Sequence, residues 1–371
     1  MIIGVPRERK ILEKRIALTP DGALELTRKG HTVLIETGAG AGAHFPDEAF
    51  RAVGCEIVPT LEDVWTKADI VTKVKEPHEE EYKYLREGLI LFDYLHLASM
   101  PDLSKKVIES GVTSIAYELV SDEQNRLPLL DPMSEVAGKL SVINGQNYLL
   151  QQNGGRGVLL GGTMTTAPRN VLIVGAGISG RAACEMALGL GARVTVLDIN
   201  KKALENIKHW YGNQARTILS SRAMLDREMA RADLVIGAVL VPGAAAPKVI
   251  TKDMIKSMKR GSVFVDISID QGGCSETSRP MNLDNPIYEV DGVLHFCVCN
   301  MPTQTARTST LALADSTLPF LMQLADHGLA ALDKNPHLRA ALHTHKGNLT
   351  NFAVAEAIGV EAISIDEALK K

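Results

Sequence analysis

Short apolar runs alternate with longer amphipathic stretches over most of this chain of 371 residues. The first runs are rich in Val, Ile, Leu and Thr, and they predict strands at residues 2–5, 32–36, 70–74, 89–94 and 113–117. Helical patterns fill several of the gaps, and the clearest covers residues 19–29, where Thr19 can cap a helix that Pro20 begins. Alternation of this kind predicts a parallel, doubly wound sheet.

The same alternation returns in the middle of the chain, with strands predicted at 171–174, 194–197, 234–239, 262–267 and 293–298. Long helical patterns at 132–152 and 310–332 flank this second set, and we expect the C-terminal segment to return to the first domain. The predicted fold class is therefore α/β with two Rossmann-like, doubly wound domains. A nucleotide-binding domain of residues 129–306 is inserted into a discontinuous substrate domain of residues 1–128 and 307–371.

The strongest motif follows the apolar run 171–174, where Gly175, Gly177 and Gly180 form a GxGxxG pattern. In a dinucleotide-binding turn, the first glycine allows a tight bend and the second lets the backbone approach a pyrophosphate. The third glycine lets the next helix lie close to its strand, and the helix N-terminus attracts the phosphates. A second strand pattern ends at Asp198, where an acid binds the adenosine ribose and repels a 2′-phosphate. The sequence thus predicts NAD rather than NADP.

A second glycine-rich segment, from Gly38 to Ala43, fits the same pattern after the strand predicted at 32–36. His44, Phe45 and Pro46 follow at once, and a proline disfavours a helical residue before it. No helix can therefore begin where phosphates would need one. We interpret this segment as a loop of the first domain.

The composition is that of an ordinary globular protein, with 45% hydrophobic and 23% charged residues and a net charge of −4. This balance gives no electrostatic argument for binding nucleic acid or membranes. No apolar run approaches the ~20 residues that span a bilayer, and the first residues lack the anatomy of a signal peptide. We expect a cytoplasmic protein.

Cysteine and histidine positions argue for packing rather than for metal binding. Five cysteines, an odd number in a long chain, fit reduced core thiols better than a disulfide framework. Cys297 and Cys299 would share one face of an apolar strand, where packing is the simpler explanation. His343 and His345 have no convincing third ligand and are expected to be exposed, so we predict no metal site.

Polar residues at strand ends suggest a substrate site, since ligands of open α/β sheets bind beyond the carboxyl ends of the strands. Lys75 follows one predicted strand, His96 follows the next, and Asp270 follows a strand of the second set. Arg15 lies in the loop after the first strand. Hydride transfer at a carbon bearing oxygen or nitrogen needs such groups: an imidazole that moves protons near neutral pH, a cation for a substrate carboxylate, and a carboxylate that orients ammonia or water.

Each of these residues also has a purely structural interpretation. His96 fits a hydrogen-bonded core histidine as well as an acid/base, Lys73 and Lys75 fit exposed charges at a strand end, and Asp270 fits a turn cap. Arg15 fits a surface loop residue. Asp266 alternates with apolar neighbours and is interpreted as structural.

At these residues the chain resembles the L-alanine dehydrogenases over essentially its whole length. Ordered matches lie in the opening residues, around Arg15, at Val74–Pro77 and Leu95–Leu97, in the segment 132–138, in the glycine motif, and at 269–274, 300–302 and 307–310. The resemblance implies the two-domain fold predicted above, assembly as a homohexamer, and the reversible conversion of L-alanine, NAD and water to pyruvate, ammonium and NADH, a route of L-alanine catabolism.

The resemblance also assigns roles. Arg15 and Lys75 would bind the substrate carboxylate and carbonyl, His96 would be the acid/base, and Asp270 would assist the ammonia or water step. The residues that would line the NAD site, besides the glycines of the motif and Asp270, are Ser134, Ile178, Asp198, Ser220, Val239, Leu240, Ile267, Arg279, Val298, Cys299, Asn300 and Met301.

One segment departs from the family pattern. Residues Thr303 to Ala306 replace the small, proline-containing sequence expected near the cofactor, which puts details of closure and rate in doubt. The main alternative is the nucleotide-binding module of a proton-translocating transhydrogenase, which needs no acid/base for a small substrate; Lys75 and His96 argue against it. Saccharopine-type dehydrogenases are a weaker alternative, and a non-enzymatic binding module would bind NADH without turnover.

Overall fold

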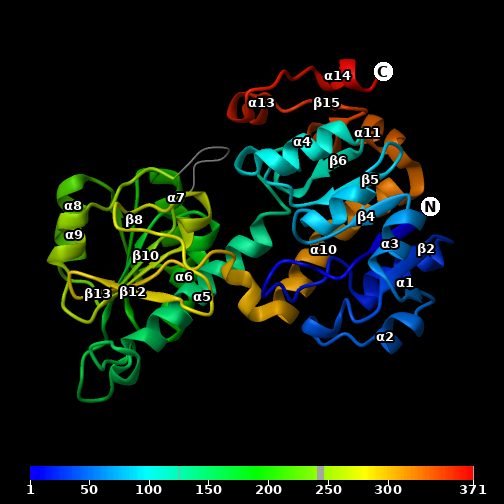
Figure 1. Cartoon of the computed structure of the whole chain (residues 1–371). Helices are drawn as coiled ribbons and strands as arrows, with labels where there is room; N and C mark the ends of the chain where they lie inside the picture. Colours follow the sequence, from blue (N-terminus) through cyan, green and yellow to red (C-terminus); the bar gives the residue numbers. More distant parts are fainter. Residues whose placement is uncertain (125, 240–245, 371) are drawn as a thin grey trace. The chain divides into compact units, whose positions relative to one another are not determined.

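The computed structural model describes residues 1–124, 126–239 and 246–370 (Figure 1). The chain divides into unit 1, Met1–Met133 with Thr303–Lys371, and unit 2, Ser134–Pro302. Unit 1 is therefore built from both ends of the chain. The divisions lie at 133/134 and 302/303 rather than at the predicted 128/129 and 306/307. Helix α5 (Asp131–Leu149) runs through the first division, and helix α10 (Ala306–His327) begins just after the second.

Unit 1 contains an eight-stranded sheet of order β15-β14-β6-β5-β4-β1-β2-β3. The six consecutive strands from β6 to β3 pair in parallel, as predicted for this sheet. The strand bounds are β1 Ile2–Val5, β2 Thr32–Glu36, β3 Glu56–Val58, β4 Ile70–Thr72, β5 Ile90–Asp93, β6 Thr113–Ala116, β14 Leu342–His345 and β15 Asn348–Leu349. The order reverses between β1 and β4, which makes this the topological switch point of unit 1.

Helices cover the unit 1 sheet, and its interior is apolar. Trp65 and Val64 of α3 are fully buried and belong to one core cluster with Val71 and Leu91. α1 begins as predicted, because Pro20 is its first residue and the Thr19 hydroxyl accepts the Gly22 N–H at 3.2 Å. The helices of unit 1 other than α10 are α1 Pro20–Arg28, α2 Asp47–Arg51, α3 Leu61–Lys67, α4 Pro101–Glu109, α11 Ala331–Lys334, α12 Pro336–Ala340, α13 Phe352–Ile358 and α14 Ile365–Ala368.

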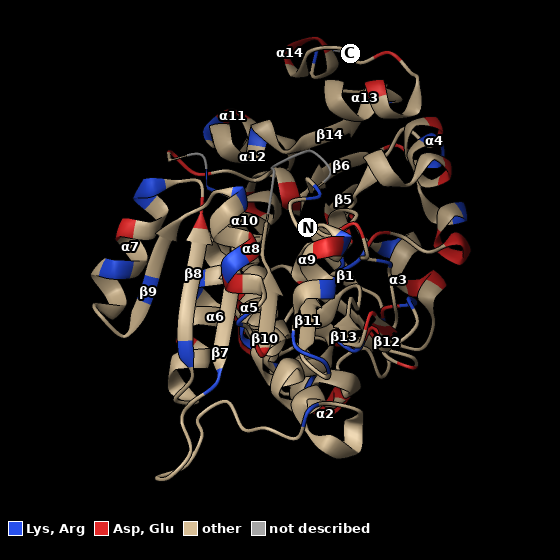
Figure 2. Ribbon diagram, turned by 90° about the vertical axis from the view of Figure 1, so that its left-hand side faces the viewer, with Lys and Arg blue, Asp and Glu red and all other residues tan. Residues whose placement is uncertain are grey.

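Unit 2 contains a seven-stranded sheet of order β12-β13-β11-β10-β7-β8-β9, with its switch point between β7 and β10. The strand bounds are β7 Asn170–Val174, β8 Arg193–Asp198, β9 Ala215–Leu219, β10 Leu234–Gly237, β11 Val263–Asp266, β12 Ile287–Val290 and β13 Val293–Phe296. The helices are α6 Ile178–Gly189, α7 Lys201–Tyr211, α8 Arg222–Met229 and α9 Lys252–Ser257. Lys and Arg are interspersed with Asp and Glu on α7, α8 and α9 (Figure 2).

The two sheets are mainly parallel, as predicted, but each also has antiparallel pairing at an edge, which was not predicted. β12 pairs antiparallel with β13, and β14 pairs antiparallel with both β6 and β15. The β12–β13 hairpin turns at Asp291 and Gly292, and the β14–β15 hairpin turns at Lys346 and Gly347; all four residues have positive φ. Two-residue turns of this backbone conformation join antiparallel strands, so the edge strands are set by local turn chemistry.

The glycine-rich segment from Gly38 to Ala43 forms a loop, as predicted. It contains one short 3₁₀ turn, η1 Ala41–Ala43, which ends at His44 with φ 60°. The next α-helix, α2, begins only at Asp47, so no helix N-terminus faces the glycines. Among the described residues, we find no helix with the length and apolar character needed to cross a membrane.

Candidate active site

Three neighbouring strands of unit 1 deliver the predicted substrate residues to one edge of its sheet. Arg15 lies in the loop after β1, and Lys75 lies three residues after the end of β4, so the two loops flank the switch point. His96 follows β5, the next strand in the sheet. In open α/β sheets, loops at this position form the ligand crevice. The structure therefore places Arg15, Lys75 and His96 at the carboxyl edge of the same sheet.

The Arg15 side chain is only 2% exposed and is held by Glu13, a residue that the sequence analysis missed. Its Nε and Nη2 donate to the two Glu13 oxygens at 2.7 and 2.6 Å, and Nη1 lies 3.1 Å from the Met133 sulfur. Burial alone would lower the pKa of Arg15, but the Glu13 carboxylate outweighs it and raises that pKa, so the guanidinium is charged. The surface-loop interpretation of Arg15 was wrong.

Lys75 is partly buried, and the next residue, Glu76, is part of its electrostatic setting. Burial would raise the pKa of the Glu76 carboxyl, but the ammonium groups of Lys75 and Lys10 hold it below its usual range. The Lys10 ammonium contacts Glu76 Oε1 at 2.6 Å. Glu76 is therefore a carboxylate that balances the positive charge at this loop.

His96 occupies a backbone conformation that a β-carbon disfavours, with φ 49° and ψ 35°. The Glu118 carboxylate holds it there: Oε1 accepts the His96 N–H at 2.7 Å, and both oxygens accept the Leu95 N–H at 3.2 Å. The imidazole is 41% exposed, lies parallel to the Tyr94 ring at 5.8 Å, and places Nδ1 3.8 Å from Glu118. His96 is therefore an accessible imidazole beside a carboxylate, and the core interpretation was wrong.

The glycine motif of unit 2 has the geometry of a dinucleotide-binding turn. Gly175 has φ 113°, and a β-carbon there would lie 2.2 Å from the Ala238 carbonyl oxygen. A β-carbon at Gly180 would lie 1.9 Å from the Gly175 oxygen, so this glycine lets α6 approach β7. Gly177, by contrast, would meet nothing within 4 Å; it precedes Ile178, the first residue of α6. The open backbone at a helix N-terminus is where a pyrophosphate fits.

Asp198 ends β8, and its carboxylate connects the loop after β7 with the loop after β8. Oδ2 accepts the Ala176 N–H at 2.6 Å, within the glycine motif, and Oδ1 accepts the Asn200 N–H at 2.6 Å. Ser220 lies beside it, because its N–H donates to the Asp198 carbonyl at 2.8 Å. Asp198 therefore positions the glycine turn while remaining partly accessible.

Asp270 lies in a short 3₁₀ helix, η6 Ile267–Gln271, that starts directly after β11. Its carboxylate accepts the Asn300 N–H, at 3.0 Å to Oδ1 and 3.4 Å to Oδ2. Asp266 is fully buried and accepts the N–H groups of Ser268 at 3.0 Å and Cys274 at 2.9 Å, so it fixes both ends of this segment. Asp266 is thus structural, as predicted, and Asp270 is exposed.

The remaining predicted cofactor residues lie on unit 2. Val239 follows β10 and exchanges hydrogen bonds with Ser268, at 3.0 Å to its N–H and 2.8 Å to its carbonyl. Arg279 lies over the Tyr288 ring at 4.1 Å. The others are Ser134 near the start of α5, Ile178 at the start of α6, Ile267 at the start of η6, and the segment Val298, Cys299, Asn300 and Met301 after β13. Leu240 lies outside the described residues.

The departure at Thr303 to Ala306 bears on the substrate loop. The Thr303 hydroxyl donates to the Leu12 carbonyl at 2.7 Å and lies 3.5 Å from Glu13 Oε1. Thr303 is therefore a second support for the loop that carries Arg15.

All five cysteines are free, and Cys297 is buried whereas Cys299 is partly exposed.

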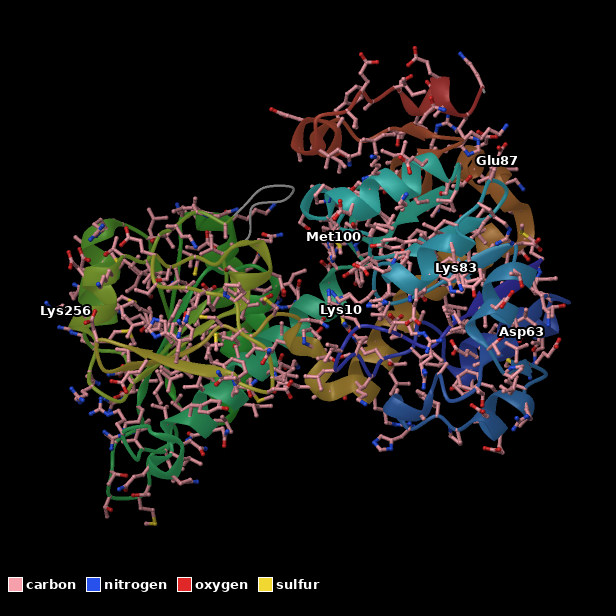
Figure 3. All side chains as sticks on the ribbon, viewed as in Figure 1. Lys10, Asp63, Lys83, Glu87, Met100 and Lys256 are labelled. Atoms are coloured by element: carbon pink, nitrogen blue, oxygen red, sulfur yellow. The ribbon has the colours of Figure 1, made fainter. Side chains whose placement is uncertain are left out.

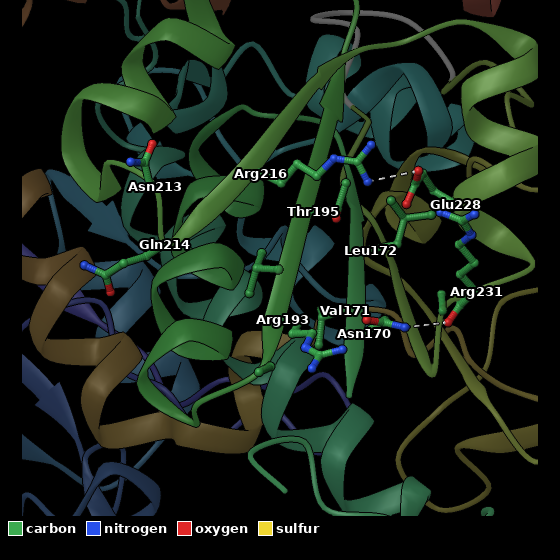
Figure 4. A pocket seen from close by; sticks show the side chains of 13 residues that line it. Asn170, Val171, Leu172, Arg193, Thr195, Asn213, Gln214, Arg216, Glu228 and Arg231 are labelled. Atoms are coloured by element: carbon green, nitrogen blue, oxygen red, sulfur yellow. Dashed lines mark hydrogen bonds and ion pairs between the residues drawn. The ribbon is translucent and has the colours of Figure 1, made fainter. Parts of the chain in front are cut away.

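A cavity of about 520 Å³ in unit 2 lies away from the glycine motif. Its lining includes Asn170 and Arg193, the first residues of β7 and β8, and Arg216 of β9 (Figure 4). This is the amino edge of the sheet, opposite the edge where the glycine motif lies. This cavity therefore lies apart from the predicted cofactor residues.

The histidines at 343 and 345 are buried, at 2% and 5% exposure, because β14 lies inside the unit 1 sheet between β6 and β15. The prediction that they are exposed was wrong. Burial lowers the pKa of His343 to about 4, so this ring is neutral near pH 7. No cluster of three or more potential metal ligands occurs among the residues that the structure describes.

Comparisons with known proteins agree with this architecture. Sequence models described as "Alanine dehydrogenase/PNT, N-terminal domain" and "Alanine dehydrogenase/PNT, C-terminal domain" match residues 4–137 and 141–352. Relatives named alanine dehydrogenase include proteins of Halomonas elongata, 49% identical over 98% of both chains, and of Mycolicibacterium smegmatis, 48% identical over 96% of both.

Solved structures show the same relationship. An L-alanine dehydrogenase superimposes with a TM-score of 0.94 and 43% identity, covering 97% of this chain and 99% of that one. A transhydrogenase from Sinorhizobium meliloti superimposes with a TM-score of 0.82 and 25% identity, covering 95% and 99%. The sequence resemblance is thus confirmed, and the chain belongs to the alanine dehydrogenase/PNT family of α/β oxidoreductases.

Proposed function

We propose that this chain catalyses the reversible, NAD-dependent oxidative deamination of L-alanine to pyruvate and ammonium. The observation that carries the proposal is the delivery of Arg15, Lys75 and His96 by three adjacent strands to the carboxyl edge of the unit 1 sheet. A small 2-oxo or 2-amino acid needs two cationic groups and one proton-transfer group. These side chains supply that set.

Arg15 and Lys75 would bind the substrate carboxylate and carbonyl. The Arg15 Nη1 lies 3.1 Å from the Met133 thioether sulfur, and a substrate carboxylate is a much stronger acceptor than a thioether. Glu13 keeps the guanidinium fixed from its other side. Lys75 is more accessible and would polarise the carbonyl oxygen.

His96 would act as the acid/base. In the deaminating direction it would take a proton from the water that attacks the imine carbon, and the Glu118 carboxylate would stabilise the resulting imidazolium. Asp270 would orient that water or the ammonia. When NAD is bound, its nicotinamide accepts the hydride of the alanine Cα, so alanine, NAD and water yield pyruvate, ammonium, NADH and one proton.

The glycine motif supports NAD as the coenzyme. The open backbone at Gly177 would accept the pyrophosphate, and Asp198 would bind the adenosine ribose hydroxyls. The negative charge of Asp198 opposes a 2′-phosphate, which favours NAD over NADP. The other predicted residues of unit 2, from Ser134 to Met301, would complete the site.

The alternative is a nucleotide-binding module of the transhydrogenase type, because the transhydrogenase structure from Sinorhizobium meliloti has a similar fold. Such a module exchanges hydride with another nucleotide domain and needs no imidazole beside two cations. The accessible His96, held by Glu118, therefore favours the amino-acid dehydrogenase.

The test is a coupled assay of the purified protein. We expect NADH oxidation with pyruvate plus ammonium, and NAD reduction with L-alanine. A panel of other amino acids, glycine and glyoxylate included, defines the substrate range. A protein that binds NADH but turns over none of these substrates contradicts the proposal.

We further infer a cytoplasmic homohexamer. Size-exclusion chromatography with light scattering checks the assembly, and cell fractionation checks the location.

A further inference from the structure

Glu8 connects the two loops that flank the switch point of unit 1. It lies three residues after the end of β1, on the loop that also carries Arg15, and is 9% exposed. Its Oε1 accepts the Val74 N–H at 2.6 Å. Val74 immediately precedes Lys75, so this hydrogen bond fixes the backbone from which the Lys75 side chain begins.

A buried ion pair supports the same segment from the other side. Lys73 is 1% exposed, and its ammonium donates to both Glu81 oxygens at 2.7 Å. Glu81 is itself completely buried. The second Glu8 oxygen, Oε2, lies 3.7 Å from the Lys73 ammonium and has no hydrogen-bond partner within the described residues. Glu8 therefore adds charge attraction to its hydrogen bond with Val74.

A second contact joins the same two loops: the ammonium of Lys10 (labelled in Figure 3) meets Glu76 at 2.6 Å. The Lys10 side chain is half exposed, so this ion pair contributes little to the stability of the loops. The buried contact of Glu8 is the stronger one, because a hydrogen bond is worth more where water is excluded.

Burying the Glu8 carboxyl group carries an electrostatic cost. Burial raises the pKa of Glu8 to about 7; Lys73 and the Val74 N–H lower it, whereas Glu13 and Glu81 raise it further. Asp93, at the end of β5, is completely buried nearby in the same field, and burial raises its pKa well above the usual range. A carboxyl group placed at such a cost at a ligand crevice points to a role in positioning.

We propose that Glu8 is a positioning residue for substrate binding: it fixes the Lys75 segment relative to the loop that carries Arg15. This inference rests on the proposed function, since it takes Lys75 and Arg15 as the substrate contacts. It adds a residue that touches neither substrate nor coenzyme. The effect should therefore fall on substrate affinity and spare the binding of NADH.

The experiment compares two substitutions at this position. Glu8→Gln keeps an acceptor oxygen at the same reach but removes the charge, whereas Glu8→Asp keeps the charge but shortens the side chain by one methylene. We expect Glu8→Asp to raise the KM for pyruvate about tenfold, which corresponds to the loss of one buried hydrogen bond. Its KM for NADH should stay within about twofold of the parent. Glu8→Gln should leave the pyruvate KM near the parental value, because its amide oxygen can still accept the Val74 N–H.

Glu36→Asp is the matched control. Glu36 is also buried, accepts the Arg7 N–H at 2.9 Å and pairs with Arg9, but within the described residues it makes no hydrogen bond or ion pair with residues 73–76. We expect this shortening to lower the thermal midpoint without raising the pyruvate KM.

Three outcomes overturn the proposal: a parental pyruvate KM in Glu8→Asp, an equal rise in the NADH KM, or the same rise in Glu36→Asp. If Glu8→Asp does not fold, Glu8→Gln decides alone, since a tenfold rise in a variant that retains the acceptor also overturns the proposal. An unmodified protein without activity on pyruvate would reject the proposed function instead, so the two failures are distinguishable.

Discussion

Replacing Asp198 by Asn tests how this chain selects its coenzyme. The carboxylate accepts two backbone N–H groups at 2.6 Å, one from Ala176 in the glycine motif and one from Asn200. An amide side chain has one acceptor oxygen, so one of these N–H groups loses its partner. A hydrogen bond to a charged group contributes about 1.5–3 kcal/mol, so we expect the KM for NAD to rise at least about tenfold.

Loss of the hydrogen bond to the glycine turn weakens the binding of NAD and NADP equally. The ratio of the kcat/KM values for the two coenzymes therefore reports the effect of the Asp198 charge alone. A 2′-phosphate about 4 Å from the carboxylate is repelled by about 1 kcal/mol per unit charge in water. With close to two charges on the phosphate, the repulsion is about 2 kcal/mol, or roughly a thirtyfold preference. The Asp198→Asn substitution should remove most of this preference.

The assay is initial-rate kinetics with L-alanine and each coenzyme, for the parent and for Asp198→Asn. Asp226→Asn is the control, because Asp226 is an exposed acid of the same unit, on α8, and it pairs with Arg222. Its coenzyme ratio should equal that of the parent. A parent that already prefers NADP, or a ratio unchanged by Asp198→Asn, would refute the interpretation of this acid.

Substitutions at three further positions probe unit 1. His96→Ala should lower kcat by roughly 10²–10⁴ while NADH binding, followed by fluorescence titration, stays intact; an unchanged kcat removes His96 from the acid/base role. Glu118→Ala should lower kcat about tenfold and Glu118→Gln much less, because the amide can still accept the His96 N–H; equal effects would show that this hydrogen bond is not what matters. His343 is neutral when folded, with a pKa of about 4, against 6.5 when unfolded, so stability is fully present above pH 6.5 and is lost as the pH falls toward 4. His343→Leu should flatten the fall of the thermal midpoint over this interval, and a slope equal to the parent's contradicts the assignment.

The sequence determined the positions of most strands and the identity of the glycine turn. Runs of β-branched residues predicted ten strands within a few residues, because such runs pack on both faces of a buried parallel sheet. Local chemistry also predicted the start of α1 at Pro20 and the absence of a helix after Gly42. The strands β3, β9, β12, β14 and β15 were missed, although Asp291 and Gly292 mark the hairpin that contains β12.

Only the tertiary structure decided which charged residues support others. Glu13, Glu118 and Glu8 have no motif, and each acts through a contact with a residue on another part of a loop or strand. His343 illustrates the same limit, since its burial depends on β14 pairing with β6, more than 200 positions earlier in the chain. Sequence patterns record the local backbone preference of a segment and which face of each helix or strand is buried in the core. The partner of a buried charge is chosen by distances that exist only after folding, because the free energy of a buried ion pair changes steeply with separation and solvent access.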